Sequence, residues 1–487
     1  MLFNSYIFIF LFLPIVVLGY YGLHYLNKPK LALGFLILMS MWFYGYNSIK
    51  YLMILITSIL LNYCIVRLMD RMDNNRFRRA LLVAGVTLNI GILFCFKYYD
   101  FFIENVNAVL KTDFRFLQLV LPLGISFYTF QQLSYVIDSY GRECERYSLL
   151  EYAAYVSFFP QLIAGPIVYH DELIPQLRAK ENHRINYENL SKGIYAFSLG
   201  LAKKVLLADT FSKIVSIGYF KVGELNSTSV LILMVCYSLQ IYFDFSGYCD
   251  MAYGIGYMFN VQLPVNFNSP YKAASVSEFW DRWHMTLTRF FTKYIYIPLG
   301  GSRKGRIRTY VNVLFVFLVS GIWHGANWTF ILWGILNGLG NLFDRLFGKF
   351  FRWMPKAIRV LITFCFCNVA WCLFRAESIE QWRYILERFT YWDFGRVYEL
   401  YTEAFNELIE VKCLYRMGFG RLIEAFPGSM LILFLVVTSL ACFFLKNTQE
   451  KVADGKYTGK RIIVTTGLLL WSVMSLTGVS EFLYFNF

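Results

Sequence analysis

The chain has 487 residues, of which 57% are hydrophobic and only 16% charged, and its formal net charge is +14. Soluble domains carry roughly 25% charged residues, so this composition excludes a water-soluble globular fold. The positive charge would indicate nucleic-acid binding in a soluble protein, but here Lys and Arg gather in short connections between apolar runs. That distribution is typical of the positive-inside bias of membrane proteins, so no nucleic-acid partner is expected.

Apolar runs of membrane-spanning length recur along the chain. They lie near residues 5–26, 31–48, 50–68, 81–97, 118–137, 150–168, 190–207, 228–258, 309–327, 328–346, 357–375, 429–446 and 462–480. Because about 20 helical residues cross the hydrocarbon core, we predict an all-α, polytopic membrane bundle with about eleven to thirteen membrane-embedded helices, in one domain over residues 1–487. The first run, Tyr6–Tyr25, lacks a basic start and a small-residue cleavage site, so it is predicted to be a retained span rather than a signal peptide.

The basic connections predict an orientation. The connection after the third run is expected in the cytoplasm because it holds Arg67, Arg71, Arg76, Arg78 and Arg79. Counting back through Lys28 and Lys30 then places the N-terminus outside. A second basic connection precedes the last run, so the C-terminal tail 482–487 is also expected outside. We expect segment 376–428 to lie on the extracytoplasmic side and to form short interfacial helices. We expect segment 150–188 to dip into the membrane and return.

Two histidines lie in or beside apolar sequence, where polar residues are costly and mark functional sites. His324 lies in Ser320–Trp328, beside glycines that allow close approach, and His284 lies in the amphipathic stretch Ser277–Met285. A neutral imidazole tolerates burial and can take and return a proton near neutral pH. Transfer of an acyl group from a thioester to a hydroxyl requires such a base. From the residues alone, a hydrogen bond that packs helices is an equally good interpretation.

For each of four charged residues, the sequence allows two different roles. Asp244 and Asp250 lie in one apolar run, where they either line a polar tunnel or pair with neighbouring helices. Arg303 and Arg306 follow the Gly300–Gly301 turn, where they either bind the phosphates of coenzyme A or only obey the positive-inside bias. None of the ten cysteines has a metal-binding spacing, so no metal site is predicted.

Six motifs within about residues 121–346 resemble the membrane-bound O-acyltransferase (MBOAT) family. In chain order they are Gln161–Ile167, Phe243–Ala252, Asn266–Tyr271, Glu278–His284, Tyr296–Gly301 and Gly321–Gly325. Within the family, Trp323–Phe330 is most similar to the branch that O-acetylates alginate or peptidoglycan, whereas the D-alanyl transferases of teichoic acid are more distant.

The resemblance implies a bundle around a central tunnel, with His324 as the catalytic residue and His284 as a second candidate. It makes six residues candidates for the tunnel or for substrate binding: Asp244, Asp250, Trp323, Asn327, Arg303 and Arg306. No bound cofactor is implied. Acetyl-CoA, or an acyl carrier protein, would be the cytoplasmic donor, and a separate SGNH-hydrolase-type acetyltransferase would be the extracytoplasmic partner. The implied location, among membrane lipids, is a bacterial cytoplasmic membrane.

The last six residues, Phe482–Phe487, resemble the aromatic tail of a small partner protein in the D-alanylation system, whose tyrosine is proposed to carry the acyl group. A phenol with a pKa of about 10 is a weak nucleophile until a base removes its proton, and the aryl ester formed is a good donor. We therefore hypothesise that Tyr484 returns into the tunnel and is acetylated with His324 as base. The alternative is an aromatic belt that anchors the last helix.

The sequence thus predicts an O-acetyltransferase that moves acetyl groups across the membrane to an extracytoplasmic polysaccharide. One alternative is a lipid or protein O-acyltransferase, which would not need Tyr484. Another is a polysaccharide transporter or flippase, although the chain lacks the internal repeats common in transporters. The chain also contains no phosphate-binding Gly-Lys-Ser/Thr motif and no Gly-x-Ser-x-Gly elbow, which argues against an ATPase and a serine hydrolase.

Overall fold

The computed structural model describes residues 1–487 except 456–457, 477–481 and 484–487. Within these ranges the chain is helical and contains no strand, only an isolated bridge between Phe267 and Trp283, which confirms the predicted all-α class. The first half forms α1 (Leu13–Tyr25), α2 (Pro29–Gly45), α3 (Ile49–Arg71), α4 (Asn75–Leu93), α5 (Tyr99–Leu110), α6 (Ile125–Gly141), α7 (Leu149–Ser157), α8 (Phe159–Leu162), α9 (His170–Arg178), α10 (Tyr187–Ala202), α11 (Asp209–Phe220) and α12 (Ser227–Met258).

The second half continues with more helices. They are α13 (Val276–Trp280), α14 (Met285–Phe291), α15 (Arg306–His324), α16 (Trp328–Phe347), α17 (Lys356–Arg375), α18 (Ile379–Thr390), α19 (Glu399–Asn406), α20 (Ile409–Leu414), α21 (Gly420–Ala425), α22 (Ser429–Phe444), α23 (Thr448–Ala453) and α24 (Gly459–Met474). Wider π-helical turns are η1 (Phe8–Phe12), η2 (Phe94–Tyr98), η4 (Lys203–Ala208), η7 (Thr292–Tyr296) and η9 (Tyr415–Phe419), and short 3₁₀ turns are η3 (Lys180–His183), η5 (Val222–Glu224), η6 (Pro270–Lys272) and η8 (Phe350–Trp353).

Among the described residues, six helices are long and apolar enough to cross a membrane, or up to seven if one pair bent by 98° forms a single span. The six are Phe8–Tyr25, Ile49–Arg71, Asn75–Leu110, Ser227–Met258, Arg306–His324 and Lys356–Arg375. They establish a multi-pass membrane protein. The predicted eleven to thirteen membrane-embedded helices also include apolar runs that form shorter or broken helices; in the run at 118–137, for example, α6 begins only at Ile125.

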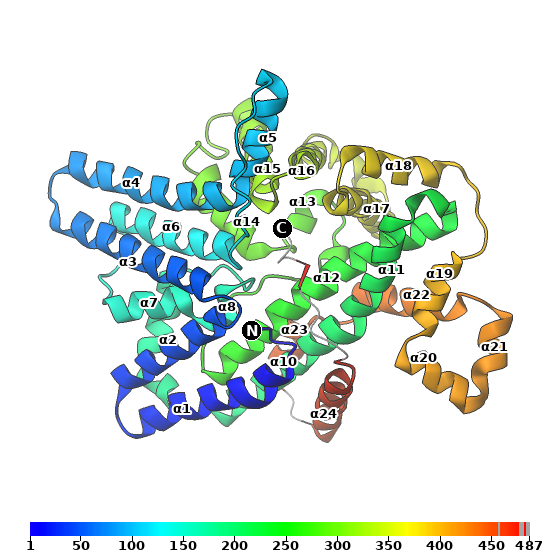
Figure 1. Cartoon of the computed structure of the whole chain (residues 1–487), viewed down its shortest axis with the longest axis horizontal. Coiled ribbons are helices and arrows are strands. Elements are labelled where there is room, and N and C mark those ends of the chain that lie inside the picture. The colour runs from blue at the N-terminus through cyan, green and yellow to red at the C-terminus, as the bar shows by residue number, and fades with distance from the viewer. Residues whose placement is uncertain (456–457, 477–481, 484–487) are drawn as a thin grey trace.

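The central helix is α12, which lies in the middle of the bundle in Figure 1. It has 32 residues, so it is about 48 Å long. Of its most apolar stretch of 18 residues, 89% is buried inside the protein. Facing glycines let α10 pack directly on its backbone: Gly193 meets Gly254 and Gly200 meets Gly247, where an added Cβ would lie within 2.8 Å of the opposite carbonyl oxygen. Small residues of this kind are the usual means of close helix packing in membranes.

Segment 150–188, expected to be re-entrant, turns back so that its two ends lie close together, whereas its dip into the membrane stays a prediction. Helices α7, α8 and α9 are too short to span. Arg178, at the end of α9, pairs with Glu145 at 2.7 Å and Glu151 at 2.6 Å, both near the start of the segment. Arg146 lies 3.8 Å from Asp70, so this end of the segment meets the basic connection after α3.

Segment 376–428 forms the predicted short helices, α18 to α21, at the edge of the molecule on the right of Figure 1. They attach to the start of α12, where the Asp393 carboxylate accepts hydrogen bonds from the backbone and hydroxyl of Ser227. The Arg388 side chain donates to the carbonyl of Leu225. These polar contacts fasten the outer helices to the central helix.

Candidate active site

His324 is the last residue of α15 and is 3% exposed. Its position depends on close packing between α15 and α16. A Cβ atom on Gly321 would lie only 2.4 Å from the carbonyl oxygen of Phe330, so a larger residue at 321 would push the two helices apart. Nδ1 of His324 lies 2.6 Å from the carbonyl oxygen of Ser320. A carbonyl can only accept, so Nδ1 carries the proton and Nε2 is the basic nitrogen. The backbone thus sets the tautomer that a general base requires.

Aromatic rings form the walls around this imidazole. The centroids of Trp323, Trp333 and Phe374 lie 4.8, 4.9 and 5.4 Å from that of His324. The indole Nε1 atoms of Trp323 and Trp333 are buried and have no hydrogen-bond partner among the described residues. Buried polar groups usually have partners, so two donors without one beside a histidine favour a ligand-binding role.

His284 is fully buried and immediately precedes α14. Its φ of 48° lies in the left-handed region, where backbone strain is often associated with functional sites. Nδ1 lies 3.1 Å from Oδ1 of Asn266, and this amide oxygen can accept a hydrogen bond from it. Burial lowers the pKa of His284 well below its ordinary value, so the ring is neutral near pH 7. The ring centroid lies 6.1 Å from that of Trp323, so one indole contacts both predicted histidines and the structure brings them together.

Lys97, in η2, is a residue of this site that the sequence analysis missed. Its ammonium group donates to the carbonyl oxygens of Trp323 at 2.7 Å and His324 at 3.0 Å, at the C-terminal end of α15. A cation stabilises the negative end of a helix dipole and satisfies its last carbonyl groups. A lysine at the end of the apolar run 81–97 was the signal that could have identified it.

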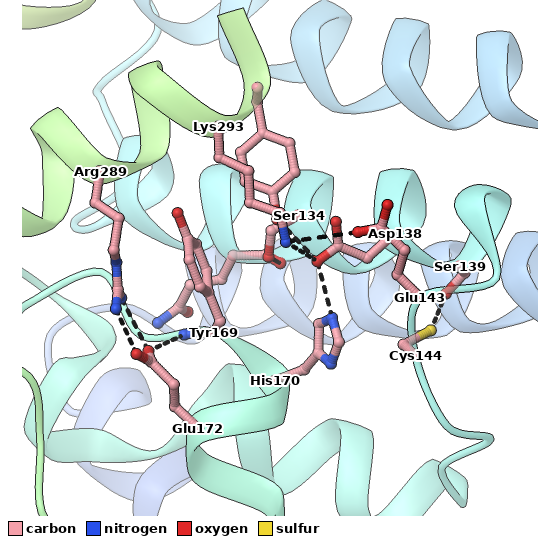
Figure 2. A network of polar contacts seen from close by, with 12 residues as sticks. Ser134, Asp138, Ser139, Glu143, Cys144, Tyr169, His170, Glu172, Arg289 and Lys293 are labelled. Atoms are coloured by element: carbon pink, nitrogen blue, oxygen red, sulfur yellow. Dashed lines mark hydrogen bonds and ion pairs between the residues drawn. The ribbon is translucent and has the colours of Figure 1, made fainter. Parts of the chain in front are cut away.

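A buried polar network holds the helix that begins beside His284. Figure 2 shows Asp138 of α6 between His170 of α9, at 3.2 Å, and Lys293 of η7, at 3.0 Å. Arg289 of α14 forms a two-pronged ion pair with Glu172 of α9. Because these contacts join α14 and η7 to the re-entrant segment and to α6, they fix the position from which His284 projects.

A cavity of ≈ 330 Å³ lies between α13, α14, α15 and α16. Arg345 and Tyr296 line it, and so does Ser320, whose carbonyl holds His324. Its wall also includes Trp280, whose ring packs 5.6 Å from that of Trp333. The cavity therefore reaches the residues that orient the His324 imidazole.

Asp244 and Asp250 pair with neighbouring helices, which was one of their two predicted roles. Asp244 accepts a hydrogen bond from Lys204 at 2.6 Å, and Asp250 accepts from Lys203 at 2.5 Å and from Thr448 at 2.6 Å. The two consecutive lysines belong to η4, so these ion pairs fasten η4 to α12. A role in lining a tunnel stays a prediction.

The described part of the C-terminal tail lies inside the bundle. Phe482 is 1% exposed, and its ring packs 4.7 Å from that of Tyr248 in α12. The backbone N–H of Leu483 donates to Asp244 at 2.9 Å, one residue before Phe245, whose ring contacts His284 at 4.8 Å. Figure 1 shows this red segment beside α12. Because Phe482 is buried, it does not belong to an aromatic belt at the membrane interface. Tyr484 lies outside the described residues.

The remaining predicted residues lie farther from the histidines or hold local structure. Asn327 caps the start of α16 by accepting from the backbone of Thr329 at 3.0 Å, and its amide donates to the carbonyl of Glu377. Arg303 and Arg306 are exposed before and at the start of α15. Because His324 ends that helix, about 27 Å from Arg306 along the axis, the structure does not bring these arginines to the imidazole.

The chain is similar in sequence to known acyltransferases of membranes. The model of the MBOAT, membrane-bound O-acyltransferase family matches residues 39–379. A peptidoglycan O-acetyltransferase of Helicobacter pylori is 40% identical, over 100% of this chain and 98% of the relative. A probable alginate O-acetylase AlgI of Pseudomonas aeruginosa is 35% identical, over 79% of this chain and 74% of the relative. A teichoic acid D-alanyltransferase of Bacillus subtilis is 24% identical, over 54% of this chain and 70% of the relative.

Proposed function

The chain belongs to the membrane-bound O-acyltransferase family and is an acyltransferase, and from that premise we propose that it passes acetyl groups from cytoplasmic acetyl-CoA to an extracytoplasmic glycan, with His324 as general base. The observation that carries this proposal is the hydrogen bond from His324 Nδ1 to the Ser320 carbonyl oxygen. That bond leaves Nε2 as the nitrogen that can accept a proton from an attacking hydroxyl group.

The chemistry follows the usual path of acyl transfer. Nε2 of His324 removes the proton from the acceptor hydroxyl as its oxygen attacks the thioester carbonyl carbon. The negative charge that develops on the carbonyl oxygen needs preorganised donors, and we assign this role to the indole N–H groups of Trp323 and Trp333, which have no hydrogen-bond partner among the described residues. The carbon–sulfur bond then breaks, and the imidazolium returns the proton to the thiolate of coenzyme A.

The ≈ 330 Å³ cavity supports a route for the donor. Arg345 lies in the last turn of α16 and lines this cavity. The sequence that follows holds Lys349, Lys356 and Arg359, so the positive-inside bias favours a cytoplasmic position for this end of α16. A thioester arm that enters beside Arg345 would pass Trp280 and reach Ser320, whose carbonyl oxygen contacts His324. An acyl carrier protein could present the same thioester arm. An assay of acetyl transfer with each donor in turn therefore distinguishes acetyl-CoA from a carrier protein.

We assign the first acceptor hydroxyl to Tyr484. Leu483 binds the carboxylate of Asp244, and the neighbouring Phe245 ring contacts His284, so the described end of the tail lies close to one of the two histidines. In this scheme the acetylated tyrosine hands its acetyl group to an SGNH-type partner outside the cytoplasmic membrane. The full-length peptidoglycan O-acetyltransferase relative makes peptidoglycan the first glycan to test. A lipid or protein acceptor is the alternative, and it would not use Tyr484.

The test incubates the purified full-length protein with acetyl-CoA labelled in the acetyl group. We expect release of free CoA and a base-labile label on the C-terminal peptide. The Tyr484→Phe variant keeps the aromatic ring and removes the hydroxyl, so it should lose the label and glycan acetylation in cells, whereas Phe485→Tyr, which keeps Tyr484, serves as the matched control. Wild-type glycan acetylation by Tyr484→Phe would refute the carrier role, and failure to release CoA with any acceptor would refute acetyl-CoA as donor.

A further inference from the structure

A second cavity lies away from the histidines, between α1, the start of α2, α9 and η3. Its volume is ≈ 1240 Å³, and we call it the α1–α9 cavity. It shares no lining residue with the ≈ 330 Å³ cavity below His324. Neither the acyl transfer proposed above nor the re-entrant packing explains why so large a space opens at this place.

One wall of the α1–α9 cavity is apolar and faces the hydrocarbon. Val17, Leu18 and Leu33 line it, and Leu18 is 70% exposed on α1, a helix of a membrane span. An exposed leucine on a spanning helix contacts lipid chains in a membrane. The cavity is therefore open to the bilayer along this wall, and an acyl chain can lie on it without leaving an apolar environment.

The opposite rim is cationic. Lys30, Lys180 and Arg184 line the cavity, and none of the three has an ion-pair partner among the described residues. The rim's fourth cation, Arg178, is neutralised by Glu145 and by Glu151, the only carboxylate in the lining. Three charges thus converge from α2, η3 and the residue after η3 without an anion to balance them.

Two stacked imidazoles also line the α1–α9 cavity. The rings of His24, in α1, and His183, in η3, lie 3.9 Å apart at an interplanar angle of 21°. The Nε2 of His183 lies 3.1 Å from the Leu177 carbonyl oxygen, which can only accept, so this nitrogen carries a proton. The stack joins the first helix to the re-entrant segment, so the cavity is not a gap between loose elements.

The rim lies at the end of the bundle predicted to face the cytoplasm. The guanidinium group of Arg178 lies 5.2 Å from the ring centre of Tyr147, whose carbonyl oxygen accepts from Arg67. Arg67 lies near the C-terminal end of α3, beside the basic residues predicted to face the cytoplasm. Cytoplasmic leaflets carry anionic lipids, and basic pockets between membrane helices on that side bind their headgroups.

We propose that the α1–α9 cavity binds an anionic phospholipid of the surrounding membrane, with its phosphate at Lys30, Lys180 and Arg184 and an acyl chain along Leu18 and Leu33. Phosphate oxygens complement the three cations, and the apolar wall open to the bilayer favours a lipid over a soluble phosphate. The bound lipid would join α1 and α2 to the re-entrant segment without taking part in acyl transfer.

The experiment measures binding of spin-labelled phosphatidylglycerol to the full chain in phosphatidylcholine nanodiscs. The triple variant Lys30→Gln, Lys180→Gln, Arg184→Gln removes the rim charges. The matched control Arg71→Gln, Arg76→Gln, Arg79→Gln removes three exposed charges at the same end of the bundle that do not line the cavity. Each lost cation is expected to weaken the preference for phosphatidylglycerol by about fivefold.

We expect the rim variant to lose this preference while the control keeps most of it and both release CoA at the wild-type rate. A rim variant with wild-type preference would overturn the proposal, and so would an equal loss in the control, which would indicate ordinary surface attraction. Displacement of the labelled lipid by millimolar glycerol 1-phosphate would also overturn it, in favour of a soluble phosphate ligand. If the triple variant does not fold, Arg184→Gln alone should show the single about fivefold loss.

Discussion

His170 and His324 are almost equally buried, at 1% and 3% exposure, but their surroundings differ. Both ring nitrogens of His170 contact side chains: Nδ1 lies 3.2 Å from the Tyr147 hydroxyl and Nε2 lies 3.2 Å from Asp138. His324 is oriented by a backbone carbonyl through Nδ1 and is walled by aromatic rings. Surroundings, rather than burial, therefore distinguish a histidine bonded to polar side chains from one held by a backbone carbonyl and walled by aromatic rings.

The charge balance of the two regions reinforces the difference. Around His170, the Asp138 carboxylate also accepts from Lys293 and from the Tyr294 hydroxyl, so the protons of this network are shared among fixed partners. A proton transfer there would leave a charge without its partner, which is costly in a buried site. Around His324 the walls are aromatic, and they can exclude water while a thioester reacts.

The largest expected effect follows from replacing the imidazole of the catalytic region. His324→Ala should lower CoA release by about 10²- to 10⁴-fold, the usual contribution of a general base. The measurement is single-turnover CoA release by purified protein, with correct insertion checked by protease protection. Wild-type CoA release and glycan acetylation in a correctly inserted His324→Ala protein would disprove the mechanism.

The same experiment on the other histidine should give the opposite pattern. His170→Gln removes contacts to Tyr147 and Asp138, so it should lower the free energy of unfolding by about 1–3 kcal/mol, because buried polar groups lose their partners. CoA release per folded molecule should stay close to wild type. Thermal unfolding in detergent measures the first quantity. A variant with unchanged stability but no CoA release would show that the comparison assigns the two histidines wrongly.

The sequence predicted the fold class and singled out two histidines that the structure brings to one indole ring, because their signals are local. The motif Gly321–Gly325 combines small residues with a histidine in an apolar run, and the structure uses Gly321 for the close packing of α15 on α16. The membrane dip of 150–188 stays a prediction, although the structure shows that its two ends lie close together. These features depend on residue type and spacing within one segment.

Other features depend on contacts between distant segments, which spacing does not encode. Lys97 contacts the carbonyls of Trp323 and His324 across 226 and 227 positions of the chain. The sequence left two possible roles for Asp244 and Asp250, because the sequence of one helix does not show which helix packs beside it. The structure shows that Lys203 and Lys204 form ion pairs with them. For a similar reason the sequence predicted membrane-embedded helices rather than spans: apolar composition does not distinguish a span from a shorter buried helix.

The smallest effect is expected at the basic cluster before α15, and it sharpens the comparison by testing which cations serve the active site. Arg303→Gln with Arg306→Gln should leave kcat unchanged and alter KM for acetyl-CoA by less than about twofold, because exposed charges contribute about 0–1 kcal/mol. Arg345→Gln is the matched control: Arg345 lines the donor cavity, and its guanidinium is held by Asn341 at 2.8 Å. Its loss should raise KM by about fivefold, as expected for a charge-assisted contact to a phosphate. If the double variant instead raised KM more than Arg345→Gln, coenzyme A would enter over Arg303 and Arg306, and the route through the ≈ 330 Å³ cavity would be wrong.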